Sequence, residues 1–238
     1  MSTMIEGIVL KKVDYREHDA MLTVLSKEGK ISILARGIQK LNSKNAPACQ
    51  PFAFSSFELL DKGHGLKKAE LIENYRKIRE DLLKQSIASI MIEVMDRLEE
   101  EMADFKKLKT CLDLLADAKQ PYCVLALFLS VCCAELGISA FVDGCIRCGN
   151  QQEIAGFSVV DGGFVCTHCL KISDVRLDVE KLRLLRMVCK AELKHYEVLA
   201  AYSGWDYQIV ELLLGIFVNY SGVSLKSGEF LAFVEGLN

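Results

Sequence analysis

The chain has 238 residues, 51% of them hydrophobic, and a formal net charge of −3. Its length allows two domains, or one domain with an insert, and its apolar content can support real cores. Residues 1–6 lack a basic segment followed by an apolar one, and the longest apolar run, residues 122–134, is too short to cross a bilayer. These features argue against an exported or membrane-spanning protein and indicate a cytoplasmic one.

Charge is unevenly distributed along the chain. Residues 1–79 contain 14 basic and 9 acidic residues, a net charge of +5, whereas the remainder has a net charge of −8. Such a split points to an anionic partner for the first part, most often nucleic acid. Ordinary solvated charge is the alternative.

Five short segments of residues 1–79 are predicted to be strands because they are apolar or alternate with polar residues: 6–10, 21–25, 30–35, 52–60 and 67–72. Five short antiparallel strands suggest a small closed barrel of the OB type. Phe52, Phe54 and Phe57 could stack on nucleic-acid bases, but their spacing places them on both faces of one strand. Burial in the core is therefore the preferred interpretation.

A basic stretch lies in the middle of this first domain. No acidic residue occurs between Glu28 and Glu58, and Gly, Asn and Ser residues within 35–45 predict a flexible loop that leaves a strand. A basic loop between barrel strands is well placed to follow a phosphate backbone, although it could also simply aid solubility. The candidate DNA-binding residues, with three from the first hairpin, are Lys11, Lys12, Arg16, Lys30, Arg36, Lys40 and Lys44.

From residue 80 the apolar period becomes helical. Helices are expected over 82–98, 106–118, 121–136, 177–199 and 207–220, with Pro121 at a helix start and Gly137 as a C-cap. The predicted fold is α+β, with an OB-fold DNA-binding domain at 1–79, a helical domain at 80–142 and 171–238, and a zinc-binding insert at 143–170.

Two C-x2-C pairs define that insert. Cys145, Cys148, Cys166 and Cys169 have the spacing of a tetrahedral zinc site with four thiolate ligands. Apolar runs flank the turn at residues 161–163, which predicts a zinc ribbon or knuckle. A redox motif of the thioredoxin type would occur singly near a βαβ pattern, and haem attachment needs a following His. Since four protein ligands leave no open position, one structural zinc is expected, with an unmetallated remnant as the alternative.

Sequence motifs for catalysis are absent. The chain has no G-x-x-x-x-G-K-[ST], G-x-S-x-G or H-E-x-x-H, and its dispersed histidines are expected to be surface or capping residues: His18, His64, His168 and His195. The six remaining cysteines are scattered, which fits buried free thiols in a reducing compartment better than a disulfide scaffold. We therefore expect no enzyme activity.

Several short motifs together resemble the amino-terminal pattern of the RecO family of bacterial recombination and repair mediators. They are Glu6-Gly-Ile-Val-Leu10, Tyr15-Arg-Glu-His-Asp19, Leu25-Ser-Lys-Glu-Gly29, Ala35-Arg-Gly37 followed by Ser43-Lys44, and Gln50-Pro-Phe52. Their order and spacing agree across residues 5–73, and many members have a four-cysteine zinc module at this location. The segment from Ile38 to Leu41 departs from the family, which often has more basic residues there.

The resemblance implies an accessory protein of DNA repair and recombination, cytoplasmic and associated with the nucleoid. It implies binding to single- and double-stranded DNA, annealing of complementary strands, cooperation with RecR, and contact with the C-terminal tail of single-strand binding protein, so that the recombinase is helped onto coated DNA. The alternative is a protein-interaction scaffold whose barrel binds a protein partner rather than DNA.

Overall fold

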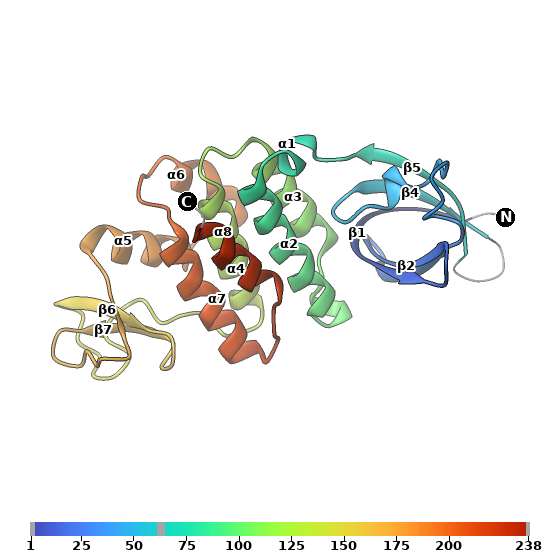
Figure 1. The fold of residues 1–238 in the computed structure, drawn as a ribbon. Coiled ribbons are helices and arrows are strands. Elements are labelled where there is room, and N and C mark those ends of the chain that lie inside the picture. Colours follow the sequence, from blue (N-terminus) through green and yellow to red (C-terminus); the bar gives the residue numbers. More distant parts are fainter. Residues whose placement is uncertain (1–2, 61–64, 237–238) are drawn as a thin grey trace. The chain divides into compact units, whose positions relative to one another are not determined.

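The structure is a computed structural model that describes residues 3–60 and 65–236. The chain divides into two compact units, Met1–Asp117 and Ala118–Asn238. An antiparallel sheet is followed by helices, so the predicted α+β class is confirmed (Figure 1). The domain boundaries drawn from the sequence stay a prediction, and His64, expected at the surface or in a cap, lies outside the described residues.

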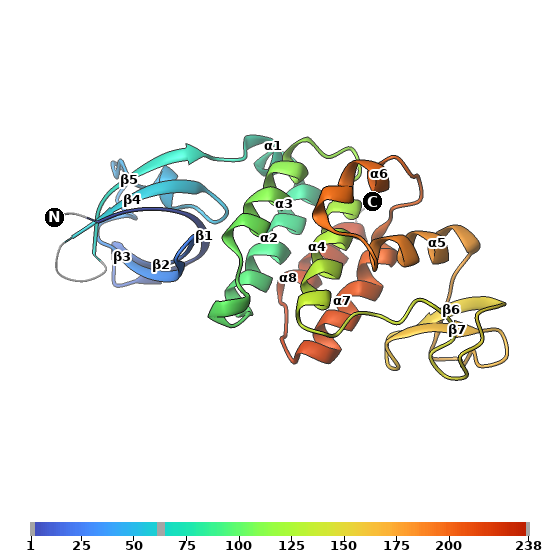
Figure 2. The ribbon, with the colours of Figure 1, turned by 180° about the vertical axis from the view of Figure 1, so that it is seen from behind.

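The first unit begins with a five-stranded antiparallel sheet in the order β3-β2-β1-β4-β5 (Figure 2). Its strands are β1 (Thr3–Tyr15), β2 (Asp19–Ser26), β3 (Gly29–Ala35), β4 (Phe54–Leu59) and β5 (Leu66–Glu73). The long central strand β1 pairs with β4 through residues 3–8 and with β2 through residues 7–15, with an irregularity between Val9 and Lys11. One strand therefore supports both halves of the sheet.

The expected closed barrel is corrected to an open one. Within the described residues, the edge strands β3 and β5 meet at a single parallel bridge between Leu34 and Gly65. Leu34 lies at the end of β3 and Gly65 just before β5, so the backbone pairing between the two edges is confined to this point in the described residues. The described residues form no continuous ladder between these edges, and OB folds are commonly partly open in this way.

The inner side of this sheet is a hydrophobic core. Val9, Leu22, Ile33 and Phe57 are buried in one cluster. Phe52 and Phe54 are buried as well, which confirms the preferred interpretation of the three phenylalanines. Phe52 has a positive φ and lies before β4, where the Arg79 guanidinium covers its ring at 4.1 Å.

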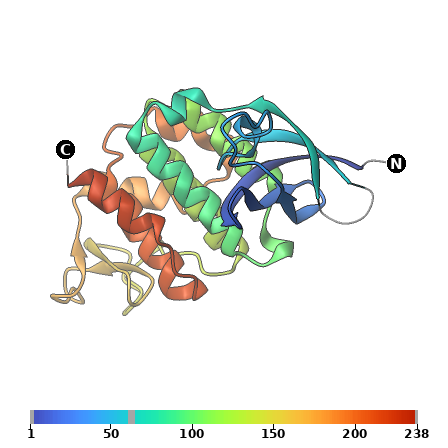
Figure 3. The same ribbon diagram turned by 45° about the vertical axis from the view of Figure 1, so that its right-hand side comes forward.

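Helices complete the first unit: α1 (Arg76–Arg79), α2 (Leu82–Arg97), the 3₁₀ turn η2 (Glu100–Met102) and α3 (Phe105–Asp117). The Asp81 side chain accepts the Lys84 N–H (3.0 Å) and so caps α2. Both α2 and α3 contact β1, as Figure 3 shows for α2. The helices predicted at 82–98 and 106–118 are confirmed.

The second unit contains further helices: α4 (Pro121–Glu135), α5 (Val179–Val188), the 3₁₀ turn η3 (Leu193–His195), α6 (Tyr196–Ala200), α7 (Tyr207–Ser221) and α8 (Ser227–Glu235). As predicted, α4 is a buried core helix, and Gly137 follows it with a positive φ. The expected single helix at 177–199 is wrong. It breaks after α5 because Glu192 adopts extended backbone and forms a reciprocal capping box with His195, which starts a new helical segment.

A small second sheet, in the order β7-β6-β8, belongs to this unit and contains β6 (Ile154–Ser158), β7 (Gly163–Cys166) and β8 (Val175–Arg176). The apolar runs around the turn at 161–163 correspond to β6 and β7, which pair antiparallel, whereas β8 had no signal in the sequence. Among the described residues, no helix has both the length and the apolarity required to cross a membrane.

Candidate nucleic-acid interface and metal centre

Six of the seven candidate DNA-binding residues lie on one hairpin and one loop of the first unit, and the seventh, Lys30, lies in β3. Lys11, Lys12 and Arg16 belong to β1 and the turn that follows it, and Arg36, Lys40 and Lys44 belong to the segment after β3. All of these except the half-buried Lys12 are exposed. Within the described part of the chain, Arg36, Lys40 and Lys44 form no ion pair. Carboxylates of the described residues therefore do not neutralise these three charges.

Hydrogen bonds attach the beginning of this loop to the β1–β2 hairpin. The Gly37 N–H donates to Asp19 Oδ1 (2.8 Å), and Gln39 donates to Asp14 Oδ1 through its side chain (2.8 Å) and to the His18 carbonyl through its backbone (3.0 Å). The Asp14 and Asp19 side chains of the hairpin thus accept from neutral donors. The arrangement brings Arg16 and the basic loop to the same end of the sheet.

The loop predicted to be flexible is instead a series of hydrogen-bonded turns. N–H groups of Lys40, Ser43 and Ala46 each donate to the carbonyl three residues earlier (2.9–3.3 Å). Ile38 is buried in the sheet core, and Asn45 Oδ1 accepts the Ala69 N–H (3.0 Å). Anchors at both ends hold the basic side chains on an ordered backbone.

Two of the candidate residues face α2 instead. The Lys30 ammonium donates to the carbonyls of Met95 (3.4 Å), Asp96 (3.1 Å) and Leu98, at the C-terminus of α2. A cation there satisfies free carbonyls and complements the helix dipole. Lys11 Nζ lies 3.6 Å from the Asp96 carboxylate. Lys30 is therefore engaged in holding the helix on the sheet.

The four cysteines of the second unit form one cluster. The sulfurs of Cys145, Cys148, Cys166 and Cys169 all lie within 4.8 Å of one another, and Cys148 Sγ is 3.7 Å from Cys166 Sγ. The edge of a tetrahedron with metal–sulfur bonds of about 2.3 Å is about 3.8 Å long. The donor set and its spacing therefore fit a tetrahedral metal ion.

Backbone geometry prepares these thiols for a cation. Gly149 adopts φ +76° and donates its N–H to the Cys145 carbonyl (2.8 Å), which turns the chain back after the first pair. Burial would raise the pKa of Cys145, but N–H groups of Cys166, Arg147 and Cys148 donate to it and bring the pKa to about 6. The Cys169 thiol donates to the neighbouring sulfurs of Cys148 and Cys166, which raises the pKa of Cys169 to about 12. A bound cation would favour the thiolate form of all four cysteines.

The cysteines outside the cluster have a different environment. Cys49, Cys111, Cys123, Cys132 and Cys133 are buried, as expected, whereas Cys189 is half-buried. Burial raises the pKa values of Cys49, Cys123 and Cys133 to about 12, so these groups stay protonated at neutral pH. They have the character of small hydrophobic core residues.

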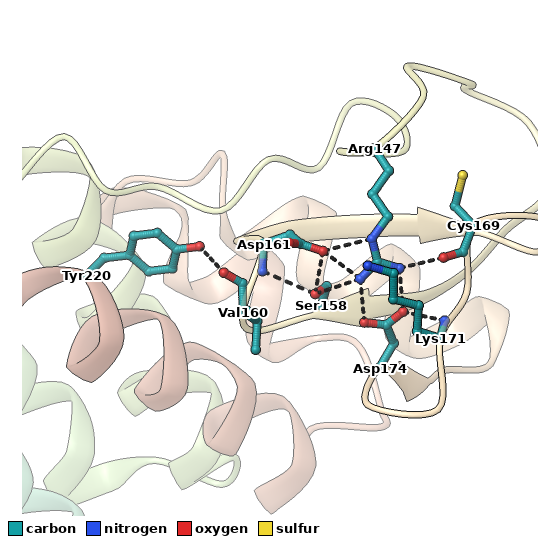
Figure 4. A network of polar contacts seen from close by, with 8 residues as sticks. All are labelled: Arg147, Ser158, Val160, Asp161, Cys169, Lys171, Asp174 and Tyr220. Atoms are coloured by element: carbon teal, nitrogen blue, oxygen red, sulfur yellow. Dashed lines mark hydrogen bonds and ion pairs between the residues drawn. The ribbon is translucent and has the colours of Figure 1, made fainter.

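Residues 143–176 contain the four cysteines and are called the cysteine module here. Arg147, which the sequence did not single out, holds this module together (Figure 4). Its guanidinium forms a two-pronged pair with the Asp174 carboxylate (2.6 and 2.8 Å) and donates through Nε to Asp161 Oδ2 (2.7 Å) and through Nη1 to the Cys169 carbonyl. The Asp174 side chain is only 1% exposed. Hydrogen bonds from Arg147 lower the pKa of the Asp174 carboxyl group to about 2. The residue between the first two cysteines thus fixes the loop that follows the last one.

A second contact joins the module to the helices of its unit. The Tyr220 hydroxyl of α7 donates to the Val160 carbonyl (2.7 Å), in the turn between β6 and β7 (Figure 4). Sequence reasoning could not foresee this contact because its partners are 60 residues apart.

An open five-stranded sheet with a basic rim, followed by a helical unit with a four-cysteine cluster, defines a two-unit α+β protein with features of nucleic-acid accessory proteins. Residues 1–75 match the family described as "Recombination protein O N terminal", and residues 79–227 match "Recombination protein O C terminal". The chain belongs to the RecO family, which functions in DNA repair and recombination.

Relatives of similar length support this membership. The chain is 31% identical to DNA repair protein RecO of Bacillus pumilus, over 98% of this chain and 94% of the relative. Its identity to the protein of the same name from Bacillus subtilis is 31%, over 100% and 96% of the two chains. For Bacillus cytotoxicus the identity is 30%, over 97% of each chain.

The motifs that carried the resemblance have structural roles in this chain. A Cβ on Gly7 would lie 2.4 Å from Val24 Cγ1 and 2.7 Å from the Leu25 carbonyl oxygen, so only glycine lets β1 approach β2 this closely. Asp19 of the second motif accepts the N–H of Gly37 in the fourth. The motifs therefore build the hairpin and attach the basic loop to it.

Proposed function

We propose that the protein is a non-enzymatic DNA-binding protein of recombinational repair, which anneals complementary single strands. The observation that carries the proposal is the ordered, acid-free loop with Arg36, Lys40 and Lys44, attached to the hairpin that presents Arg16. Cations that neutralise two phosphate backbones reduce the repulsion between them without reading sequence. Base pairing then supplies the specificity.

The proposal extends to partners and location. Together with RecR, the protein would help load the recombinase onto DNA coated by single-strand binding protein, whose C-terminal tail it would contact. It would act on single- and double-stranded DNA at the bacterial nucleoid, in the cytoplasm. Support comes from family membership and from relatives named as DNA repair proteins.

We further propose that the cysteine cluster binds one structural zinc ion. Cys145, Cys148, Cys166 and Cys169 would be the ligands, and four protein donors would leave the ion no open position for a substrate. Elemental analysis of the purified chain is expected to give one zinc per chain, and zinc-free, fully folded protein would refute the proposal.

The DNA-binding proposal is tested by the double substitution Arg36→Glu and Lys40→Glu. We expect the wild-type affinity for an oligonucleotide to fall with salt, with a log–log slope of roughly −3 to −4 if about five phosphates of a single strand are contacted. The variant should bind all sequences more weakly and with a shallower slope, because both replaced cations would face phosphates. Fluorescence anisotropy and a strand-annealing assay measure the two effects.

A charge-matched control is Lys106→Glu with Lys119→Glu, which makes the same charge change at exposed residues outside the loop. Equal losses in both variants would mean that only overall charge matters. Absent or salt-insensitive DNA binding by the wild type, together with a stable complex with a protein partner, would favour the scaffold alternative.

A further inference from the structure

The basic end of the first sheet also exposes two large side chains that are not basic. Leu41 lies between Lys40 and Lys44 and is fully exposed, and Tyr15, at the end of β1, is 41% exposed. Isolated apolar residues are common on protein surfaces and carry no meaning alone. Tyr15 and Leu41 differ from such isolated residues because they lie among cations that form no ion pair within the described residues.

Both side chains belong to the place where the loop meets the hairpin. Tyr15 is paired in register with Asp19, the residue that accepts the Gly37 N–H. Leu41 follows Gln39, which donates to the same hairpin, by two residues, or at most about 7 Å of backbone. Hydrogen bonds therefore keep Tyr15 and Leu41 near the same junction.

Arg16 lies at the same junction and contacts the Tyr15 ring. It adopts the left-handed backbone conformation (φ 58°), and its guanidinium lies 5.1 Å from the centre of the Tyr15 ring. Conformations that are unusual for a residue other than glycine concentrate at functional positions. An exposed arginine–aromatic pair offers flat surfaces on which an unstacked base can lie, with cations nearby for the adjoining phosphates.

We propose that Tyr15, Arg16 and Leu41 form a base-contacting site for single-stranded DNA, flanked by phosphate contacts from Arg36, Lys40 and Lys44. The inference rests on the proposed DNA-binding function and adds a preference for single strands. Bases inside a duplex are stacked on one another and cannot lie on the Tyr15 ring, whereas phosphates are available in both forms. The site therefore distinguishes single from double strands without reading sequence.

The test compares Tyr15→Ala, Leu41→Ala and the double variant in the full-length chain, with a labelled thymidine oligonucleotide and a blunt duplex as probes. We expect the double variant to lose about 10-fold or more in single-strand affinity. Duplex affinity should stay within about twofold, and the salt slope should not change, because no phosphate contact is removed. Met4→Ala is the control, since Met4 is 59% exposed on the same strand but at its opposite end.

The outcomes separate the two proposals. Wild-type binding that weakens with Arg36→Glu and Lys40→Glu, but not with the Tyr15 and Leu41 substitutions, would overturn this inference alone. Equal losses for single strands and duplex would also overturn it, whereas absence of wild-type DNA binding would overturn the proposed function. If circular dichroism shows that the double variant is misfolded, the single-strand affinity of Leu41→Ala decides the test, because the exposed Leu41 side chain does not contribute to the core. Photocrosslinking of a bromouracil-substituted strand should map to Tyr15, and crosslinks only at other residues would contradict the site.

Discussion

At the residue scale, two lysines of the same basic stretch have different surroundings. Lys30 directs its ammonium to three carbonyls at the end of α2, whereas Lys40 is exposed and has no ion pair within the described residues. The same residue type thus holds the fold together at one position and is available for a ligand at the other. Charge counts alone do not distinguish these roles.

We predict that Lys30→Met and Lys40→Met will have opposite effects on stability and on DNA binding. Lys30→Met should lower the free energy of unfolding by about 1–2 kcal/mol, because it removes a charged donor from the helix terminus. Lys40→Met should leave stability unchanged and weaken DNA binding. Urea unfolding followed by circular dichroism, together with anisotropy titrations, measures both. A loss of DNA affinity confined to Lys30→Met would reverse our assignment.

Sequence information was sufficient for the residues whose partners are close in the chain. The C-x2-C spacing predicted the four cysteines, since each pair brings two sulfurs together locally. Lys30 could not be assigned because its acceptors lie 65–68 residues further along. Arg147 was missed for the same reason, as Asp161 and Asp174 are 14 and 27 residues away.

At the element scale, the cysteine module has two stabilising centres with little hydrophobic core of its own. Cys145, Val165 and Cys166 are its buried cluster, and the Arg147–Asp174 pair lies beside it. Small modules of this kind commonly need a metal to fold. Strands β6 and β7 followed from apolar runs around a glycine turn, but β8 is only two residues long and left no pattern to detect.

We predict that Asp174→Asn will weaken zinc binding by about 10-fold, because it releases the arginine that orients the loop after Cys169. Asp161→Asn is the matched control, and its effect should be smaller since its side chain is 36% exposed rather than 1%. Competition with a chromophoric chelator measures the affinities. Equal zinc affinity in wild type and Asp174→Asn would exclude this role.

The ion pair also has a defined pH dependence. Arg147 lowers the pKa of Asp174 from 3.8 to about 2. A carboxyl group with a lowered folded-state pKa stabilises the fold above its unfolded pKa, and this stabilisation is lost as the pH falls from about 4 towards 2. The pair therefore contributes fully at neutral pH.

At the scale of the whole molecule, the two candidate sites belong to different compact units. The basic loop and hairpin lie within residues 1–117, and the cysteine cluster lies within residues 118–238. Each site is built from contacts inside its own unit. The proposed chemistry of one is therefore expected to survive loss of the other.

We predict that Cys166→Ser will abolish zinc binding and the order of the cysteine module while single-strand affinity stays within about twofold. Removing one of four thiolates eliminates a ligand that the module needs to fold. Cys49→Ala, a buried thiol of the first unit, should retain zinc. Elemental analysis, hydrogen exchange over residues 143–176 and anisotropy report the three properties. A large fall in DNA affinity would show that the units are coupled.

The pairing of strand β1 changes along its length. The strand pairs with β4 as far as Ile8, and Val9 exchanges backbone hydrogen bonds with Phe52 (2.8 Å) and Ala53 (3.0 Å), so only the part of β1 beyond Val9 is paired through β2 alone. Amide protons on the unpaired side near Tyr15 should exchange with solvent sooner than those at the strand's root. Because β1 is paired on both sides at its start and on one side near Tyr15, the end of the hairpin could adjust to a flexible polymer whose local curvature varies.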